Sequence, residues 1–398
     1  MNGPYKILSL DGGGSWALIQ VRVFQDLYGK DASGHDVLTR FDLIAATSGG
    51  SIVAGLLATG RPLSEILKFF RTKSDREEIF SKLPWYQRVP RVFGIGPNYS
   101  TPAKFEALVK VLGEAGSRVM EDLPASISGA AAKPDFLITS FGYDRERVVY
   151  FRSNLKSRAS SFLPTGMAEK HFTLAEAIHA SSTPPVNYFK EPAEFAGGRY
   201  WDGGVSGNNN PVLSAVVEAL SNGNPADSIR VLSIGTGLAF LPLEGPTKSP
   251  ELLVARDKPT LVTDIQKIAT TILDDPPDAA SFISHVMLGQ PLPQTAAQPV
   301  TDTNLIRLNP LVQPVRQNNV WSVPWESGGD ELNEFISLKK LPLDVIEDDG
   351  IKLIENFCDR WISGIVPNQP IRAGADLACE IGHSSYEKAK SHWQALDV

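Results

Sequence analysis

The feature with the most direct chemical meaning is a serine in a turn of small residues. Ser48 lies within Ala46–Gly50 (ATSGG), which follows the apolar run Phe41–Ala45 and precedes the helical pattern Ser51–Gly55. A strand, a sharp turn and a helix make up a nucleophile elbow, in which backbone strain exposes the serine Oγ. The helix start also directs its N–H groups toward the serine. The pattern predicts a nucleophile for acyl transfer, although a serine that caps a helix N-terminus gives a similar pattern.

A run of three glycines follows the first predicted strand. Asp11–Gly14 (DGGG) comes after Tyr5–Leu10 and before a helical pattern of apolar residues. Glycines in this position leave backbone N–H groups able to converge on one spot, which suits an oxyanion hole or a phosphate cradle. The loop has neither the Gly-Lys-Ser/Thr of a Walker loop nor the spacing of a dinucleotide fingerprint. A simple tight turn is the alternative.

An aspartate opens a second glycine-rich loop much later in the chain. The aromatic pair Tyr200–Trp201 leads into Asp202 and then Gly203–Gly207, after which Asn208–Pro211 (NNNP) opens a predicted helix over Pro211–Leu220. Asp202 is a candidate general base. An Asx turn capping the helix is the alternative.

In order and content, these three motifs resemble the patatin-like phospholipase family. Two further stretches resemble segments near that family's catalytic aspartate: Ala180–Phe189 (ASSTPPVNYF) and Leu232–Gly237 (LSIGTG). The resemblance implies a dyad with Ser48 as nucleophile and Asp202 as base. It implies an oxyanion hole at Gly12, Gly13 and Gly14. It also implies that the two catalytic loops are supported by Thr47, Gly49, Gly50, Gly203 and Gly204.

The sequence departs from the family pattern at two places. Ala46 stands where the elbow usually has glycine, and a methyl group is tolerated there if φ is negative. Ser15 and Trp16 follow the glycine loop, where the family usually has an aliphatic residue and then a cation. The missing cation argues against a role for a basic residue at the oxyanion hole, while the backbone donors are retained.

A dyad is chemically sufficient without a histidine. The third group of a triad orients the imidazole and sets its tautomer, and a carboxylate has no tautomer to set. We expect none of the histidines to be essential: His35, His171, His179, His285, His383 and His392. None of them has metal-ligand spacing with cysteine or acidic residues, so we expect no catalytic metal and no cofactor.

Composition limits the class of protein. The 398 residues are 42% hydrophobic and 21% charged, as in ordinary soluble proteins, and the net charge of −7 argues against nucleic-acid binding. Two cysteines, Cys358 and Cys379, are too few for a disulfide framework. No signal peptide and no run of about 18 apolar residues is present. These features predict a cytoplasmic protein.

Strand and helix patterns alternate, which predicts an α/β fold with a mostly parallel central sheet and helices on both faces. The predicted strands are Lys6–Leu10, Leu43–Ala46, Asp135–Ser140, Val148–Phe151, Arg199–Asp202, Arg230–Ile234 and a late strand within Asn304–Pro310. We expect a hydrolase domain over residues 1–310 and a helical C-terminal extension, packed on the same domain, over residues 311–398. Helical spacing continues over Ile351–Ile362 and Ser384–Leu396.

Two segments do not have a core pattern. Leu83–Tyr99 mixes aromatic residues with arginines, which suits a lid, a peripheral membrane contact or a long packed loop. Phe240–Thr260 is expected to be a surface insertion that leads into a helix over Leu261–Leu273.

The sequence thus predicts a lipid acyl hydrolase whose substrate is a membrane lipid or another acyl ester. Two alternatives are a phosphate- or nucleotide-binding sensor or scaffold without hydrolysis, and a phospholipase effector that needs a nucleotide or partner as activator.

Overall fold

The computed structural model describes residues 3–83, 98–128, 133–156, 171–186, 188–256, 258–260, 278–294, 298–325, 330–372 and 380–397. Three features expected from the sequence lie outside these residues: most of Leu83–Tyr99, the helix Leu261–Leu273, and Cys379.

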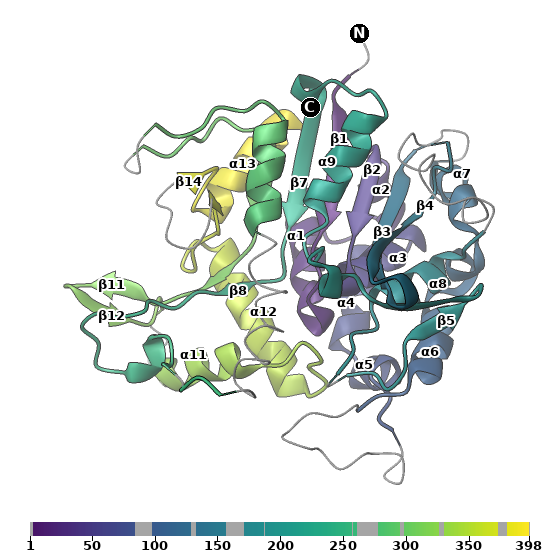
Figure 1. Ribbon diagram of the computed structural model, residues 1–398. Helices are drawn as coiled ribbons and strands as arrows, with labels where there is room; N and C mark the ends of the chain where they lie inside the picture. Colours follow the sequence, from purple (N-terminus) through teal and green to yellow (C-terminus); the bar gives the residue numbers. More distant parts are fainter. Residues whose placement is uncertain are drawn as a thin grey trace.

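A central sheet, parallel in its middle, forms the frame of the molecule (Figure 1). Its strands are β1 (Tyr5–Leu10), β2 (Leu43–Ala46), β3 (Asp135–Gly142), β4 (Arg147–Arg152), β5 (Ala193–Phe195), β6 (Gly198–Asp202), β7 (Ile229–Ile234) and β9 (Leu305–Leu308). They are ordered β5-β6-β3-β2-β1-β7-β9, and β4 also pairs with β3. The neighbours from β3 to β9 are parallel, whereas β4 and β6 pair antiparallel with β3.

The helices form layers on the two faces of the sheet. Those before the C-terminal region are α1 (Leu18–Tyr28), α2 (Gly34–Leu38), α3 (Ser48–Ala58), α4 (Leu63–Arg71), α5 (Lys73–Ile79), α6 (Thr101–Ser117), α7 (Leu123–Ser128), α8 (Leu174–Ser181), α9 (Val212–Ser221) and a helix at 278–287.

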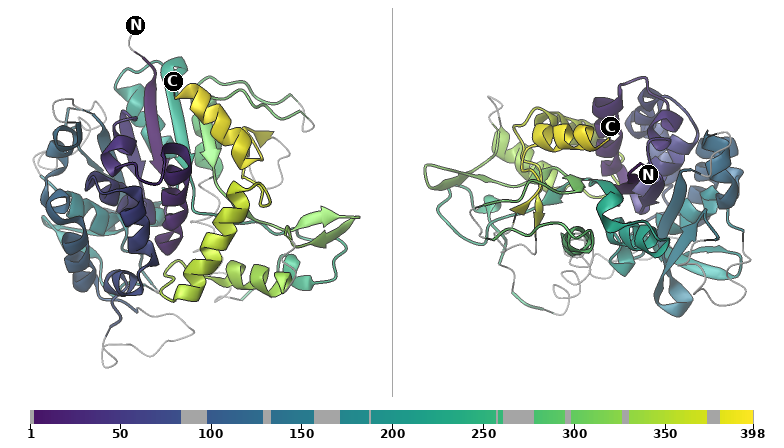
Figure 2. Two further views of the ribbon diagram at one scale, coloured as in Figure 1. Left: turned by 180° about the vertical axis from the view of Figure 1, so that it is seen from behind. Right: turned by 90° about the horizontal axis from the view of Figure 1, so that it is seen from above.

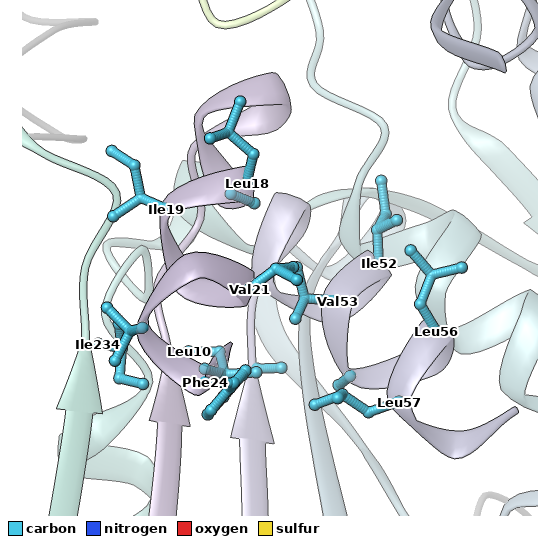
Figure 3. Packing of buried hydrophobic residues seen from close by; sticks show 14 of the residues in the cluster. Leu10, Leu18, Ile19, Val21, Phe24, Ile52, Val53, Leu56, Leu57 and Ile234 are labelled. Atoms are coloured by element: carbon cyan, nitrogen blue, oxygen red, sulfur yellow. The ribbon is translucent and has the colours of Figure 1, made fainter. Parts of the chain in front are cut away.

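Successive side chains of a strand point to opposite faces, so each strand feeds two cores. In β1, Leu8 and Leu10 join a large apolar cluster with α1, α3, α6 and α8, while Ile7 joins a smaller cluster with α9. Figure 3 shows α1 and α3 packed side by side over the ends of the parallel strands, with Val21 and Val53 between them. This packing holds the start of α1, which follows the glycine loop after β1, and the start of α3, which follows the serine turn after β2.

The C-terminal region is helical, as expected, with short strands added. Its elements are α11 (Glu331–Lys340), α12 (Asp348–Ile362), α13 (Tyr386–Leu396), and strands β10 (Leu311–Val312), β11 (Val315–Gln317), β12 (Val320–Ser322), β13 (Ile371–Arg372) and β14 (Glu380–Ile381). β10 pairs with β8 (Leu238–Ala239). α12 lies beside α1 (Figure 2). Its residues Phe357, Cys358 and Trp361 are buried in the same apolar cluster as residues of α1 and α3.

In the part of the chain that the structure describes, no helix combines the length and the apolar character needed to cross a membrane.

Candidate active site

The turn after β2 has the geometry of a nucleophile elbow. Thr47 is extended, α3 begins at Ser48, and Ser48 has a φ of +50°. A left-handed conformation is unfavourable for a residue with a side chain and costs about 1–3 kcal/mol, so the surroundings must hold it in place. The backbone N–H of Ser48 donates to Ser181 Oγ at 2.9 Å, and Ser181 ends α8. This role of Ser181 was not predicted from the sequence.

Small residues around the elbow permit close backbone approach. A Cβ added to Gly49 would lie 2.6 Å from Gly14 N, and a Cβ added to Gly50 would lie 2.5 Å from Leu10 O. Both glycines are therefore required where α3 crosses the end of β1. Thr47 is buried, and its Oγ1 donates to the Asn208 carbonyl at 2.6 Å. The elbow is thereby tied to the loop that follows Asp202.

Asp202 is the last residue of β6, and β6 runs antiparallel to β3, so Asp202 approaches the elbow from the opposite direction to the parallel strands. One edge of β3 pairs with β4. The other edge pairs with β2 as far as Ile138 and with β6 beyond it. Ala46 is level with Ile138, and Asp202 is level with Ser140, two residues further along β3. Antiparallel pairing therefore ends β6 at the level of Ser48, which is two residues beyond Ala46.

The Asp202 carboxylate is buried and hydrogen-bonded to the nucleophile. It accepts from the Ser48 hydroxyl and, at 2.8 Å, from the Gly204 N–H. Burial raises the pKa of Asp202 to about 6, while these hydrogen bonds and the charge of Lys104 act in the opposite direction. Gly203 must lack a side chain because a Cβ there would lie against Thr139. A carboxylate with this pKa is ionised at neutral pH and can accept the serine proton.

The glycine loop lies against Ser48. A Cβ added to Gly12 would lie 3.0 Å from Ser48 Cβ, and Gly14 has a φ of +56°. The Gly12 N–H already donates to the Asn209 carbonyl at 2.9 Å. Within the described ranges, the amides of Gly13 and Gly14 have no hydrogen-bond acceptor. The N–H groups of Gly13 and Gly14 therefore remain as candidate donors to an oxyanion, whereas the N–H of Gly12, also expected from the sequence to be a donor, holds the loop in place.

A buried ion pair fixes the start of this loop. Arg307 on β9 donates from Nη1 and Nη2 to the two carboxylate oxygens of Asp11, at 2.9 and 2.6 Å, and from Nη1 to Ser233 Oγ at 2.8 Å. Thr236 Oγ1 donates to the Gly12 carbonyl at 2.7 Å. Arg307 was not predicted from the sequence. An arginine inside the apolar strand Leu305–Leu308 is the signal that could have found it.

The C-terminal region contacts the other end of the loop. Ser15 donates from its backbone N–H to Leu343 O at 2.8 Å and from Oγ to Val345 O at 2.9 Å. Trp16 Nε1 donates to Pro342 O at 3.0 Å, and its ring meets the edge of Phe357. Trp16, which replaces the usual cation of the family, therefore anchors the segment 342–345.

A buried lysine also belongs to the neighbourhood of Asp202. Lys104 on α6 is 1% exposed, and its charge lowers the pKa of Asp202. It was not identified from the sequence. His179 is buried beside it, and in the described part of the chain no histidine hydrogen-bonds to the Asp202 carboxylate.

Comparison with known proteins identifies the family of this chain. The family model described as patatin-like phospholipase matches residues 8–216, which is more than half of the chain. A cUMP-AMP-activated phospholipase of Escherichia coli is 26% identical over 248 residues, covering 60% of this chain and 67% of that protein. An intracellular phospholipase A2 of Caenorhabditis elegans is 25% identical over 242 residues, covering 58% of this chain and only 19% of that protein.

Among solved structures, VipD from Legionella pneumophila aligns with 99% of this chain and 75% of its own, with a TM-score of 0.36 and 11% identity. The match to the family model spans the elbow, the glycine loop and the Asp202 loop. This chain belongs to the patatin-like phospholipase family.

Proposed function

We propose that this chain is a serine acyl hydrolase that cleaves fatty acyl esters of lipids. The observation that carries the proposal is the hydrogen bond from Ser48, held at positive φ, to a buried Asp202. Membership of the phospholipase family supports a lipid as the substrate. We propose that the enzyme acts in the cytoplasm and meets its lipid at a membrane surface.

The mechanism follows from the positions of these groups. Asp202 accepts the proton of Ser48 as Oγ forms a bond to the ester carbonyl carbon. The negative charge that develops on the carbonyl oxygen is stabilised by the N–H groups of Gly13 and Gly14. Asp202 then returns the proton to the leaving alcohol as the C–O bond breaks. A water molecule repeats these steps on the acyl-enzyme and releases the fatty acid.

The test compares wild type with Ser48→Ala and Asp202→Asn in calcium-free buffer. The substrates are p-nitrophenyl butyrate and phospholipid vesicles with a fluorogenic acyl chain. Both variants should lose at least about 1,000-fold in kcat/KM because each lacks a group that reacts directly. Ser228→Ala and Asp227→Asn, at the opposite end of β7, are matched controls and should retain full activity. Retained turnover in Ser48→Ala would refute the assignment of the nucleophile.

A second candidate is an activator-dependent phospholipase, which the Escherichia coli relative favours because its name includes activation by a cyclic dinucleotide. Wild type would then be inactive alone, and adding cUMP-AMP or another cyclic dinucleotide would start turnover. Labelling of Ser48 by a fluorophosphonate without turnover would show a reactive nucleophile that lacks its activator, whereas neither labelling nor turnover, with or without these nucleotides, would favour a sensor or scaffold.

A further inference from the structure

A lysine on the buried face of α6 is the most unusual charged group outside the dyad. Thr101, Lys104, Leu108 and Leu112 recur at helical spacing and are all buried, so Lys104 lies in the apolar stripe of its helix. Lysine is almost never fully buried unless its charge is compensated. Its position therefore requires a physical explanation.

The oxygen atoms around Nζ require an ammonium group. Lys104 Nζ donates to the carbonyls of His179, at 3.3 Å, and Ser182, and to Thr183 Oγ1 at 2.9 Å. The Thr183 hydroxyl hydrogen is already donated to His179 O at 2.5 Å, so Thr183 cannot donate to a neutral amine. Three acceptors therefore need three N–H groups, which only the protonated lysine has. The face of the Phe189 ring lies 4.8 Å from Nζ, which also favours a cation.

The same acceptors lead directly to the catalytic base. Thr183 accepts at its carbonyl oxygen the backbone N–H of Asp202 at 2.9 Å. Lys104 thus binds the side chain of Thr183, and the carbonyl of Thr183 holds the backbone of Asp202. Burial lowers the pKa of Lys104 well below its usual value, and the negative charge of Asp202 acts against this shift by favouring the ammonium form.

We propose that Lys104 is a positioning residue for the base: its ammonium group holds the segment 179–183 in place and keeps Asp202 ionised for proton transfer from Ser48. This inference rests on the proposed dyad. Lys104 is 1% exposed and its Nζ donates to three protein oxygens, so it acts through Asp202 rather than on the substrate.

Two other titratable groups next to this pair, His179 and Tyr188, are neutral at pH 7. Burial and the charge of Lys104 hold the pKa of His179 well below its usual value, so His179 is uncharged at neutral pH. Burial raises the pKa of Tyr188 to about 12, with Asp344 and Asp202 adding to the shift. Within the described residues, the cation that lowers the pKa of Asp202 is Lys104.

The experiment measures kcat/KM for p-nitrophenyl butyrate from pH 4.5 to 9 in wild type, Lys104→Met and Lys104→Gln. In wild type the acid limb should fall at the pKa of Asp202, about 6. Removal of a neighbouring cation should raise that limb by about one pH unit or more. At pH 5 this is a loss of about tenfold relative to wild type, with KM unchanged. The rate of Ser48 labelling by a fluorophosphonate should shift in the same way.

Two controls separate charge from packing. Lys110→Met, on an exposed part of α6, should leave the profile unchanged. Lys104→Arg retains the cation, so its acid limb should stay near that of wild type even if its rate falls.

An acid limb in Lys104→Met and Lys104→Gln that coincides with that of wild type would overturn the proposal. Ser48→Ala and Asp202→Asn are assayed in parallel. If these two are inactive while the lysine variants are normal, the dyad stands and only the role of Lys104 fails. If Ser48→Ala is active, the dyad itself is wrong.

Discussion

At the scale of single residues, the two groups proposed to react are held in states that oppose folding. Ser48 adopts a left-handed backbone, and Asp202 is a carboxylate removed from water. Both arrangements are unfavourable by themselves and persist only because neighbouring groups compensate. The Ser181 hydroxyl, the Gly204 amide and the Lys104 ammonium provide that compensation.

The buried carboxylate should leave a signature in stability. The pKa of Asp202 is raised from 3.8 to about 6 in the folded protein, so the folded state binds its proton more tightly than the unfolded state. The ionised group therefore destabilises the fold at pH 7, and this penalty is relieved as pH falls through 6 and is absent below about 4. Two pKa units correspond to about 3 kcal/mol.

We expect the unfolding free energy of Asp202→Asn minus that of wild type to decrease by about 2.5 kcal/mol between pH 7 and pH 4. Urea unfolding at several pH values measures it. Taking the difference removes the pH dependence of groups common to both proteins. A pH-independent difference would contradict the raised pKa.

At the scale of elements, the sequence patterns located seven strands of the central sheet, but they missed β5 and did not identify which strands pair. Leu43–Ala46 was predicted with the bounds observed, and Asp135–Ser140 ends two residues before β3 does. β6 pairs with the same edge of β3 beyond the point where β2 ends, and this position depends on the register of strands across the sheet. No local pattern encodes such a register, so Asp202 was recognised by its motif and not by its geometry.

The candidate site was predictable where its residues form contiguous motifs and unpredictable where they do not. Ser48, Asp202 and the glycine loop stand in short patterns whose residue types carry their chemistry. Lys104 and Arg307 are single cations in apolar stretches, and Arg307 pairs with a residue 296 positions earlier in the chain. Only the three-dimensional fold brings such partners together.

The close contact between Gly13 of the glycine loop and Thr236, which follows β7, can be tested by substitution. A Cβ added to Gly13 would overlap Thr236 Oγ1 and lie 2.6 Å from Thr236 Cβ. Gly13→Ala should therefore displace the loop and lower kcat/KM by about 100-fold or more, the loss typical of one oxyanion donor. Adding Thr236→Gly removes the overlap and should restore at least about tenfold of that loss.

Thr236→Gly alone is the matched control, since it loses the hydrogen bond to Gly12 O but leaves the amides in place. Normal activity in Gly13→Ala would contradict the expected displacement of the glycine loop. A double variant no more active than Gly13→Ala would show that contact with Thr236 is not the cause.

At the scale of the whole molecule, the C-terminal region shares the core of the hydrolase. The indole of Trp393 on α13 stacks on Phe41, with ring centroids 5.7 Å apart, and Lys6 of β1 forms an ion pair with Asp397 at 3.0 Å. The segment that follows α11 reaches the glycine loop, where Leu343 accepts from Ser15. We therefore propose that residues 1–310 and 311–398 unfold as one cooperative unit.

Cys358 can report on that cooperativity. It lies on α12, is fully buried, and has a thiol pKa that burial raises to about 12, so it should not react with a disulfide reagent in the folded protein. In a Cys379→Ser variant it is the only thiol of the chain. If α12 separates from the core only on global unfolding, the free energy obtained from the rate of thiol labelling should equal that from urea unfolding monitored by circular dichroism. A labelling free energy lower by several kcal/mol would mean that the C-terminal region opens while the sheet stays folded, and that the contacts on the glycine loop open with it.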